Sequence, residues 1–156
     1  MLQVNPQAHF DVVELSAPMI GLAKRRTGGS PRVSFHQQDV MEMSWTSQSY
    51  DAVVTHFFLD CLTEGDVQTL ITRLKPGLRP QGIWLISDFT IPRRGWRHWW
   101  AAFWVAAMYR FFRVTTGLRA QRLAPFEQML QVAGLRETRR QTRFGGMVVS
   151  AVWVLE

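Results

Sequence analysis

The chain reads Phe10-Asp11-Val12-Val13-Glu14 near its start, which is a short apolar run that ends in a carboxylate. A helical pattern begins two residues later, at Ser16. In a doubly wound α/β sheet, an acidic residue at the carboxyl end of the second strand hydrogen-bonds the ribose of an adenosine-containing cofactor. A first strand and a glycine-rich turn normally come before that strand, but the nine residues before Phe10 include no glycine. The stretch therefore predicts half of a nucleotide pocket.

The rest of the chain alternates between strand and helix patterns, which is typical of a mostly parallel sheet. Within it, Ala52-Val53-Val54 predicts a strand that is buried on both faces. Two final strands meet at Gly145-Gly146 and predict an antiparallel hairpin. After Phe10–Val13, the expected strands cover 32–37, 50–56, 82–89, 135–144 and 147–155, and the expected helices cover 16–26, 63–74 and 124–133.

The composition favours one cytoplasmic α/β domain over residues 1–156. Apolar residues make up 47 % of the 156 residues, which excludes general disorder. Cys61 is the single cysteine, so the chain forms no internal disulfide and no cysteine-based metal site, and it fits a reducing compartment. The four histidines lack the spacing of metal ligands, and the amino-terminal residues lack the pattern of a signal peptide.

The charge is distributed unevenly along the chain. Residues 1–89 contain seven Lys or Arg and nine Asp or Glu, whereas residues 90–156 contain eleven Arg and three Glu. Such an arginine-rich region attracts phosphates, anionic membranes or anionic substrates, and it is equally consistent with a solvated surface. The arginines are not interleaved with exposed aromatic side chains on a recognisable module, so nucleic-acid binding is not expected.

A helical insertion is expected at residues 91–118. The aromatic residues between Trp96 and Phe112 recur with helical spacing, and arginines flank them. Its apolar stretch is too short and too closely flanked by charge to span a bilayer, which takes about 20 apolar residues. Three interpretations stay open: a lid packed over the sheet, an interfacial helix on an anionic membrane, or one wall of a pocket for a flat apolar substrate.

The order of these motifs resembles class I S-adenosylmethionine-dependent methyltransferases. That resemblance implies a Rossmann-like sheet of the seven-stranded type, closed by the antiparallel hairpin, with the aromatic helical insertion after the fifth strand. The first strand and its glycine turn are missing here, so the chain is interpreted as an amino-terminally truncated copy. The stretches that carry the resemblance are Val12 to Ser16, Gln37 to Val40, Tyr50 to Asp60, Leu74 to Gly77 and Gly82 to Phe89.

The resemblance assigns S-adenosyl-L-methionine as the cofactor and places four residues beside its adenosine. Glu14 would accept hydrogen bonds from the ribose hydroxyls, and Leu15 would pack on the adenine. Asp39 would accept from the adenine amino group, with the Val40 backbone next to it. The structural alternatives are a carboxylate favoured by the helix N-terminus for Glu14 and a loop Asx turn for Asp39.

The resemblance also places His56 and Phe57, just past the fourth strand of the family, in contact with the cofactor. Methyl transfer to a strong nucleophile needs alignment more than acid–base chemistry. A hydroxyl substrate would need a base, and His56 is the best-placed imidazole for it. A structural role for His56 is the other interpretation, and no catalytic residue is assigned.

The leading hypothesis is methyl transfer to a small hydrophobic molecule, with activity in the truncated form left open. The alternative is a non-catalytic interaction or membrane-surface protein, with peripheral membrane contact through the Trp96–Phe112 helix. A nicotinamide dehydrogenase is a third hypothesis, because Glu14 would serve its ribose equally well, but Asp39 and the closing hairpin argue against it. The sequence assigns neither the methyl acceptor nor an oligomeric state.

Overall fold

The computed structural model describes residues 2–90, 99, 103 and 123–156, which belong to two compact units, Met1–Ser44 and Trp45–Glu156. The helical insertion was expected at 91–118, and most of this range lies outside the described residues, as does its expected membrane or lid role. Two of its residues, Trp99 and Phe103, are described, and their aromatic side chains are exposed. The expectation of a single domain over 1–156 stays a prediction.

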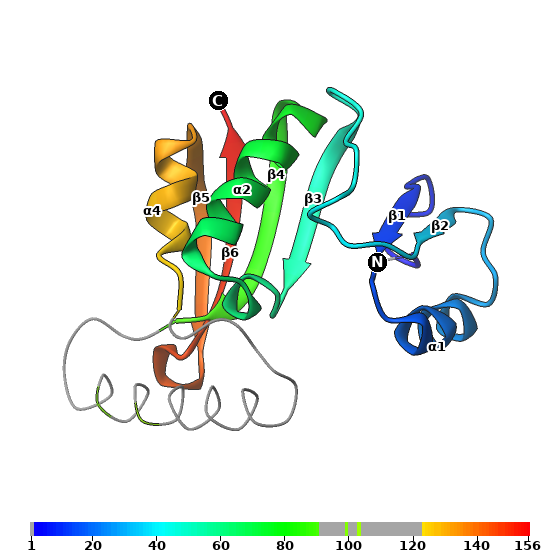
Figure 1. Ribbon diagram of the computed structural model, residues 1–156, viewed down its shortest axis with the longest axis horizontal. Coiled ribbons are helices and arrows are strands. Elements are labelled where there is room, and N and C mark those ends of the chain that lie inside the picture. Colours follow the sequence, from blue (N-terminus) through cyan, green and yellow to red (C-terminus); the bar gives the residue numbers. More distant parts are fainter. Residues whose placement is uncertain (1, 91–98, 100–102, 104–122) are drawn as a thin grey trace. The chain divides into compact units, whose positions relative to one another are not determined.

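The first unit is a parallel β-α-β element (Figure 1). Strand β1 (Phe10–Val13) pairs with β2 (Val33–His36), and α1 (Ala17–Thr27) connects them. The Ser16 hydroxyl caps α1 by accepting from the Met19 amide at 3.4 Å, at the position where the sequence predicts the helix to begin. Residues 2–8 form turns and loop rather than a strand.

The second unit is a four-stranded sheet with the order β3-β4-β6-β5 (Figure 1). Strand β3 (Tyr50–His56) runs parallel to β4 (Leu78–Phe89), and β4 runs antiparallel to β6 (Val148–Leu155). Strand β6 also pairs with β5 (Leu135–Arg143), which confirms the predicted closing hairpin. The carboxyl ends of β3 and β4 therefore lie at the same edge of the sheet.

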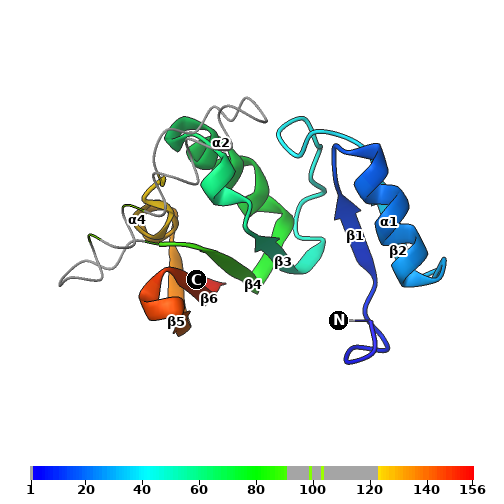
Figure 2. The ribbon, with the colours of Figure 1, turned by 90° about the horizontal axis from the view of Figure 1, so that it is seen from below.

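Helices α2 (Glu64–Leu74) and α4 (Phe126–Val132) cover one face of this sheet, as both ribbon views show (Figures 1 and 2). A capping box between Thr63 and Asp66 starts α2. The covered face carries the alternate residues of β4 and β6. The core side chains between helices and sheet are Val67, Leu70, Ile71, Leu74, Trp84, Ile86, Leu130, Val149, Ala151 and Trp153.

The prediction that Ala52-Val53-Val54 is buried on both faces is wrong. Ala52 is exposed, Val53 is half-buried and 36 % of Val54 is exposed. Strand β3 is the outermost strand of its sheet, and the described helices of this unit lie on one face only. An apolar run therefore marks a strand, but its position in the sheet decides how much of that strand is buried.

Candidate functional site

Glu14 lies at the carboxyl end of β1, immediately before α1. Its backbone amide donates to the His36 carbonyl at 3.1 Å, which extends the β1–β2 ladder by one residue. Its Oε1 accepts from the Ser16 amide at 2.8 Å, so the carboxylate also helps to start α1. A carboxylate accepts further hydrogen bonds on its second oxygen. The next side chain, Leu15, is 66 % exposed and can cover a flat ring.

Asp39 lies in the loop after β2, at the same edge of the parallel pair as Glu14. Its Oδ1 accepts from the Met41 amide at 2.8 Å, which forms the Asx turn expected as the structural alternative. The neighbouring Val40 is half-buried. These local bonds fix the direction of both carboxylates before any ligand binds, and they leave acceptor capacity on each.

The carboxyl end of β3 carries the exposed His56 and then Phe57. The Phe57 amide donates to the Ser87 carbonyl at 2.8 Å, and its backbone adopts the left-handed region with φ of 48°. This conformation is costly for a side chain of that size and needs support from its surroundings. Part of that support comes from Phe89, because the two ring centroids lie 5.1 Å apart.

No role was assigned to Asp88 or to Asp60 in the sequence analysis. Both are buried: Asp88 at the end of β4 has no exposed surface, and Asp60 in the 3-10 turn Leu59–Cys61 has 8 %. Asp88 accepts from the amides of Leu59 at 2.9 Å and Phe89 at 2.8 Å. Burial and the nearby Asp60 charge raise the pKa of Asp88 to about 7.

A sequence signal for Asp88 does exist. Trp84, Ile86 and Asp88 share the period-two pattern of β4 and face the same side of the sheet. A carboxylate that continues an apolar stripe into the core needs hydrogen-bond donors there. The position of those donors, on the loop after β3, follows only from the pairing of β3 with β4.

Cys61 follows Asp60, and its thiol lies 3.5 Å from Asp60 Oδ1. Desolvation and the carboxyl charge of Asp60 raise the pKa of this thiol to about 12. The thiol therefore stays protonated at neutral pH, which makes it a poor nucleophile. Within residues 2–90 and 123–156, no group of three His, Cys, Asp or Glu side chains is arranged to hold a metal ion.

A cavity of about 250 Å³ opens beside the carboxyl end of β4. Its lining combines apolar residues with the polar Thr90, Glu127 and Gln128, and it comes from the end of β4, the segment before α4 and the start of α4. The lining residues are Phe89, Thr90 and 123–128. Because Phe89 packs against Phe57, this cavity adjoins the loop after β3.

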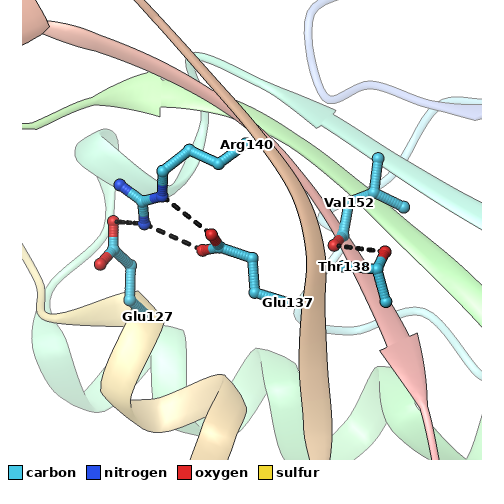
Figure 3. Close-up of polar contacts among 5 residues, drawn as sticks. All are labelled: Glu127, Glu137, Thr138, Arg140 and Val152. Atoms are coloured by element: carbon cyan, nitrogen blue, oxygen red, sulfur yellow. Dashed lines mark hydrogen bonds and ion pairs between the residues drawn. The ribbon is translucent and has the colours of Figure 1, made fainter.

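Arg140 fixes the helical wall of this cavity to the sheet (Figure 3). Its guanidinium contacts Glu127 of α4 at 2.6 Å and makes two hydrogen bonds of 2.9 Å to Glu137 on its own strand, β5. These two carboxylates hold the pKa of Arg140 above its usual range, although partial burial acts in the opposite direction. Two parallel hydrogen bonds also fix the plane of a guanidinium.

Comparison with known proteins identifies the family. Residues 1–82 match the family model described as a methyltransferase domain. The chain belongs to this methyltransferase family. It is also 32 % identical over 94 residues to the malonyl-[acyl-carrier protein] O-methyltransferase of Halalkalibacterium halodurans. The aligned stretch covers 56 % of this chain and 33 % of that protein. The chain thus spans about a third of the length of the curated relative it matches.

Solved methyltransferase structures share the fold. The N-methyltransferase NodS from Bradyrhizobium japonicum WM9, in complex with S-adenosyl-L-homocysteine, matches 94 % of this chain and 66 % of its own with a TM-score of 0.65 and 19 % identity. A methyltransferase from Methanosarcina mazei matches 99 % of this chain and 85 % of its own, with a TM-score of 0.65 and 11 % identity. The predicted Rossmann-like methyltransferase fold is confirmed. None of the described helices is long and apolar enough to cross a membrane.

Proposed function

We propose that this protein transfers a methyl group from S-adenosyl-L-methionine to a small hydrophobic molecule. The observation that carries the proposal is the match of residues 1–82 to the methyltransferase family, because this range includes the carboxyl ends of β1, β2 and β3. Ligands of doubly wound folds bind at the carboxyl ends of their parallel strands. The residues proposed to contact the cofactor are Glu14, Leu15, Asp39, Val40, His56 and Phe57.

Each proposed contact has a chemical reason. Glu14 accepts hydrogen bonds from the ribose diol, because an ionised carboxylate is the stronger acceptor for a pair of hydroxyls. Asp39 accepts from the adenine amino group, and the exposed Leu15 side chain covers one face of the ring. Phe57 and His56, at the end of β3, lie where a reacting group is presented in folds of this type.

Methyl transfer requires the protein mainly to align the methyl acceptor with the methyl donor. When bound, the cofactor supplies an electrophilic methyl group on a sulfonium. The chain then has to hold the acceptor in line with the methyl–sulfur bond and to exclude water. An exposed imidazole such as His56 can remove a proton from a hydroxyl acceptor, but an acceptor that is already anionic needs no base.

The cavity beside Phe89, whose lining includes the apolar Leu123 and Phe126, supports an acceptor with an apolar part. Its volume of about 250 Å³ suits a small molecule or one end of an acyl chain. The curated relative is named as an O-methyltransferase of malonyl-[acyl-carrier protein]. That name supports oxygen as the accepting atom and an acyl group as the part of the substrate that enters the cavity.

Calorimetric titration with S-adenosyl-L-homocysteine tests the proposal. Glu14→Gln keeps an oxygen for the Ser16 amide but loses the charge, so affinity should fall about 10- to 100-fold, the value of a charge-assisted hydrogen bond. The control is Asp11→Asn, on the same strand, whose carboxylate contacts His36 at 3.1 Å. It should bind like the unmodified protein.

Two outcomes contradict the proposal. Equal affinity in Glu14→Gln and Asp11→Asn would remove Glu14 from the cofactor site. Absence of binding to the unmodified protein would favour a non-catalytic interaction protein. A parallel titration with NAD addresses the dehydrogenase hypothesis, and we expect no binding in it.

A further inference from the structure

The turn between β5 and β6, residues Arg143 to Gly146, forms a hairpin tip that presents an aromatic side chain to solvent. Phe144 has its backbone in the left-handed region, with φ of 51°, and glycines occupy the next two positions. This conformation is unfavourable for a residue with a large side chain. Phe144 gains no burial in return, because 75 % of it is exposed. The fold therefore gives no reason for phenylalanine at this position.

Two arginines next to the hairpin tip lack a carboxylate partner among the described residues. The other arginines of β5, Arg136 and Arg140, each contact a carboxylate, whereas Arg139 and Arg143 are exposed and make no such contact. Arg140 contacts α4, and side chains alternate along a strand, so Arg139 and Arg143 lie on the opposite face of β5. The described helices of this unit do not cover that face (Figure 2).

The hairpin tip lies at the edge of the sheet where the cavity of about 250 Å³ opens. Arg143 is the register partner of Val148, which in turn is the partner of Phe89 at the end of β4. The Thr90 amide donates to the carbonyl of Met147, the first residue after the tip, at 2.9 Å. Phe89 and Thr90 both line the cavity. The tip and the cavity are therefore neighbours (Figure 1).

We propose that the hairpin tip binds an anionic lipid surface. Phe144 inserts among the acyl chains, and Arg139 and Arg143 bind the phosphates of the headgroups. An exposed aromatic ring beside arginines is the combination that proteins use at a membrane interface. The lipid provides the apolar environment that the protein does not give to Phe144, and it provides the negative charge that Arg139 and Arg143 lack.

The size of the hairpin tip favours lipid over an acidic protein as the partner. A stable protein interface buries about 800 Å² on each side, and a turn of four residues offers much less. A lipid surface adapts to a narrow tip and needs no complementary shape. One ring and two cations give weak and reversible binding, which is typical of a peripheral contact with a single anchor.

This contact has a consequence for the substrate. An acceptor with an apolar part concentrates in lipid, and the hairpin tip places the cavity next to the lipid surface. The acceptor then enters the cavity from the membrane without crossing water. This consequence rests on the proposed function, whereas the lipid contact itself does not.

Flotation of the full chain with lipid vesicles tests the contact without any cofactor. The protein should bind vesicles of phosphatidylcholine mixed with an equal amount of phosphatidylglycerol, and it should bind pure phosphatidylcholine more weakly. Raising the ionic strength from about 0.1 M to about 1 M shortens the Debye length from about 10 Å to about 3 Å, so binding should fall. Absence of binding to the anionic vesicles, or equal binding to both kinds, would overturn the proposal.

A substitution at Phe144 assigns the insertion to the hairpin tip. Asparagine tolerates the left-handed backbone, so Phe144→Asn keeps the turn but loses the ring. Its partition coefficient on anionic vesicles should fall by about tenfold. The control is Val132→Asn at the end of α4, because Val132 is another apolar residue that is 87 % exposed. It should bind like the unmodified protein, and equal losses in both variants would contradict the insertion of Phe144.

Substitutions on β5 test the arginines. Arg139→Gln and Arg143→Gln should each reduce binding to anionic vesicles by about fivefold, the usual effect of one cation near such a surface. The control is Arg136→Gln on the same strand, because Arg136 contacts Glu156 at 2.8 Å and lies about 20 Å from the tip. A loss in the control as large as in the other two variants would show a general effect of charge rather than a contact at the tip.

Titration with S-adenosyl-L-homocysteine separates this inference from the proposed function. Vesicle binding by a protein that does not bind S-adenosyl-L-homocysteine keeps the lipid contact and removes methyl transfer. Binding of S-adenosyl-L-homocysteine by a protein that stays free of anionic vesicles has the opposite meaning. Phe144→Asn should bind S-adenosyl-L-homocysteine like the unmodified protein, because Phe144 is not among the proposed cofactor contacts.

Discussion

Trp84 of β4 and Trp153 of β6 are register partners in the antiparallel pair, and neither has any exposed surface. Their indole N–H groups are in different situations. Trp84 Nε1 donates to the Thr55 hydroxyl at 3.1 Å. For Trp153 Nε1, no acceptor lies within hydrogen-bonding distance among the described residues. A buried donor without a partner costs about 1–3 kcal/mol.

This difference predicts unequal effects of two matched substitutions. Trp153→Phe removes volume but also removes the unpaired donor, so the two effects offset each other. Trp84→Phe removes similar volume and a satisfied hydrogen bond, and it should lower the free energy of unfolding by about 1 kcal/mol more than Trp153→Phe. Urea unfolding of both variants provides the measurement. Equal losses would show that the Trp153 indole has a partner in solution.

The second prediction concerns Arg140, which connects α4 to β5 through Glu127 and Glu137. Arg140→Gln leaves these two carboxylates without their cation. The Arg140 side chain is about one-third exposed, so solvent screens part of its attraction to the two carboxylates. The free energy of unfolding should therefore fall by about 1 kcal/mol. The control is Arg139→Gln, at an exposed neighbouring position, which should change it by less than about 0.5 kcal/mol. A larger effect at Arg139 would contradict the bridging role of Arg140.

The third prediction is a pH dependence of global stability. In the unfolded chain the Asp88 carboxyl ionises near its ordinary pKa of 3.8, whereas in the folded protein it keeps its proton up to about pH 7. The folded state thus binds more protons between these values, so the free energy of unfolding should fall as pH rises from about 4 to about 7 and then level off. Unfolding midpoints across this range provide the measurement, and Asp88→Asn should show a smaller fall. An equal fall in both proteins would assign the pH dependence to other groups.

The fourth prediction concerns Cys61, whose thiol is exposed yet has its pKa raised to about 12 from an ordinary value of 9.0. At pH 8 its thiolate fraction is lower by about a thousandfold than that of an ordinary cysteine. Alkylation by iodoacetamide should therefore be far slower in the folded protein than in urea. Asp60→Asn removes a neighbouring negative charge and should accelerate the reaction. Equal rates in folded and unfolded protein would contradict the raised pKa.

Local sequence patterns predicted the elements whose stabilising contacts are local. The start of α1 near Ser16, the start of α2 near Thr63 and the turn near Gly145-Gly146 all depend on residues within a few positions of each other. The alternatives given for Glu14 and Asp39 were of the same kind, and both local hydrogen bonds are present. Whether these carboxylates also bind a cofactor stays a prediction.

Features that depend on distant parts of the chain were missed. The contact of Asp88 with Leu59 joins residues 29 positions apart, and it exists only because β3 and β4 end at the same edge. The exposure of Val54 likewise follows from the place of β3 at the margin of its sheet. The alternating pattern of side chains along one strand predicts neither the contact nor the exposure.

The place of β4 between β3 and β6 has a consequence for folding kinetics. The β5–β6 hairpin closes over the short turn Phe144–Gly146, whereas the β4–β6 pair joins segments far apart in the chain. Loop-closure entropy grows only with the logarithm of loop length, so a longer connection costs little stability. Non-local pairing nevertheless slows folding. Glycine-serine residues added between β4 and α4 should therefore reduce the refolding rate more than they increase the unfolding rate, and stopped-flow experiments measure both rates. A larger effect on the unfolding rate would mean that β4 pairs with β6 only after the rate-limiting step.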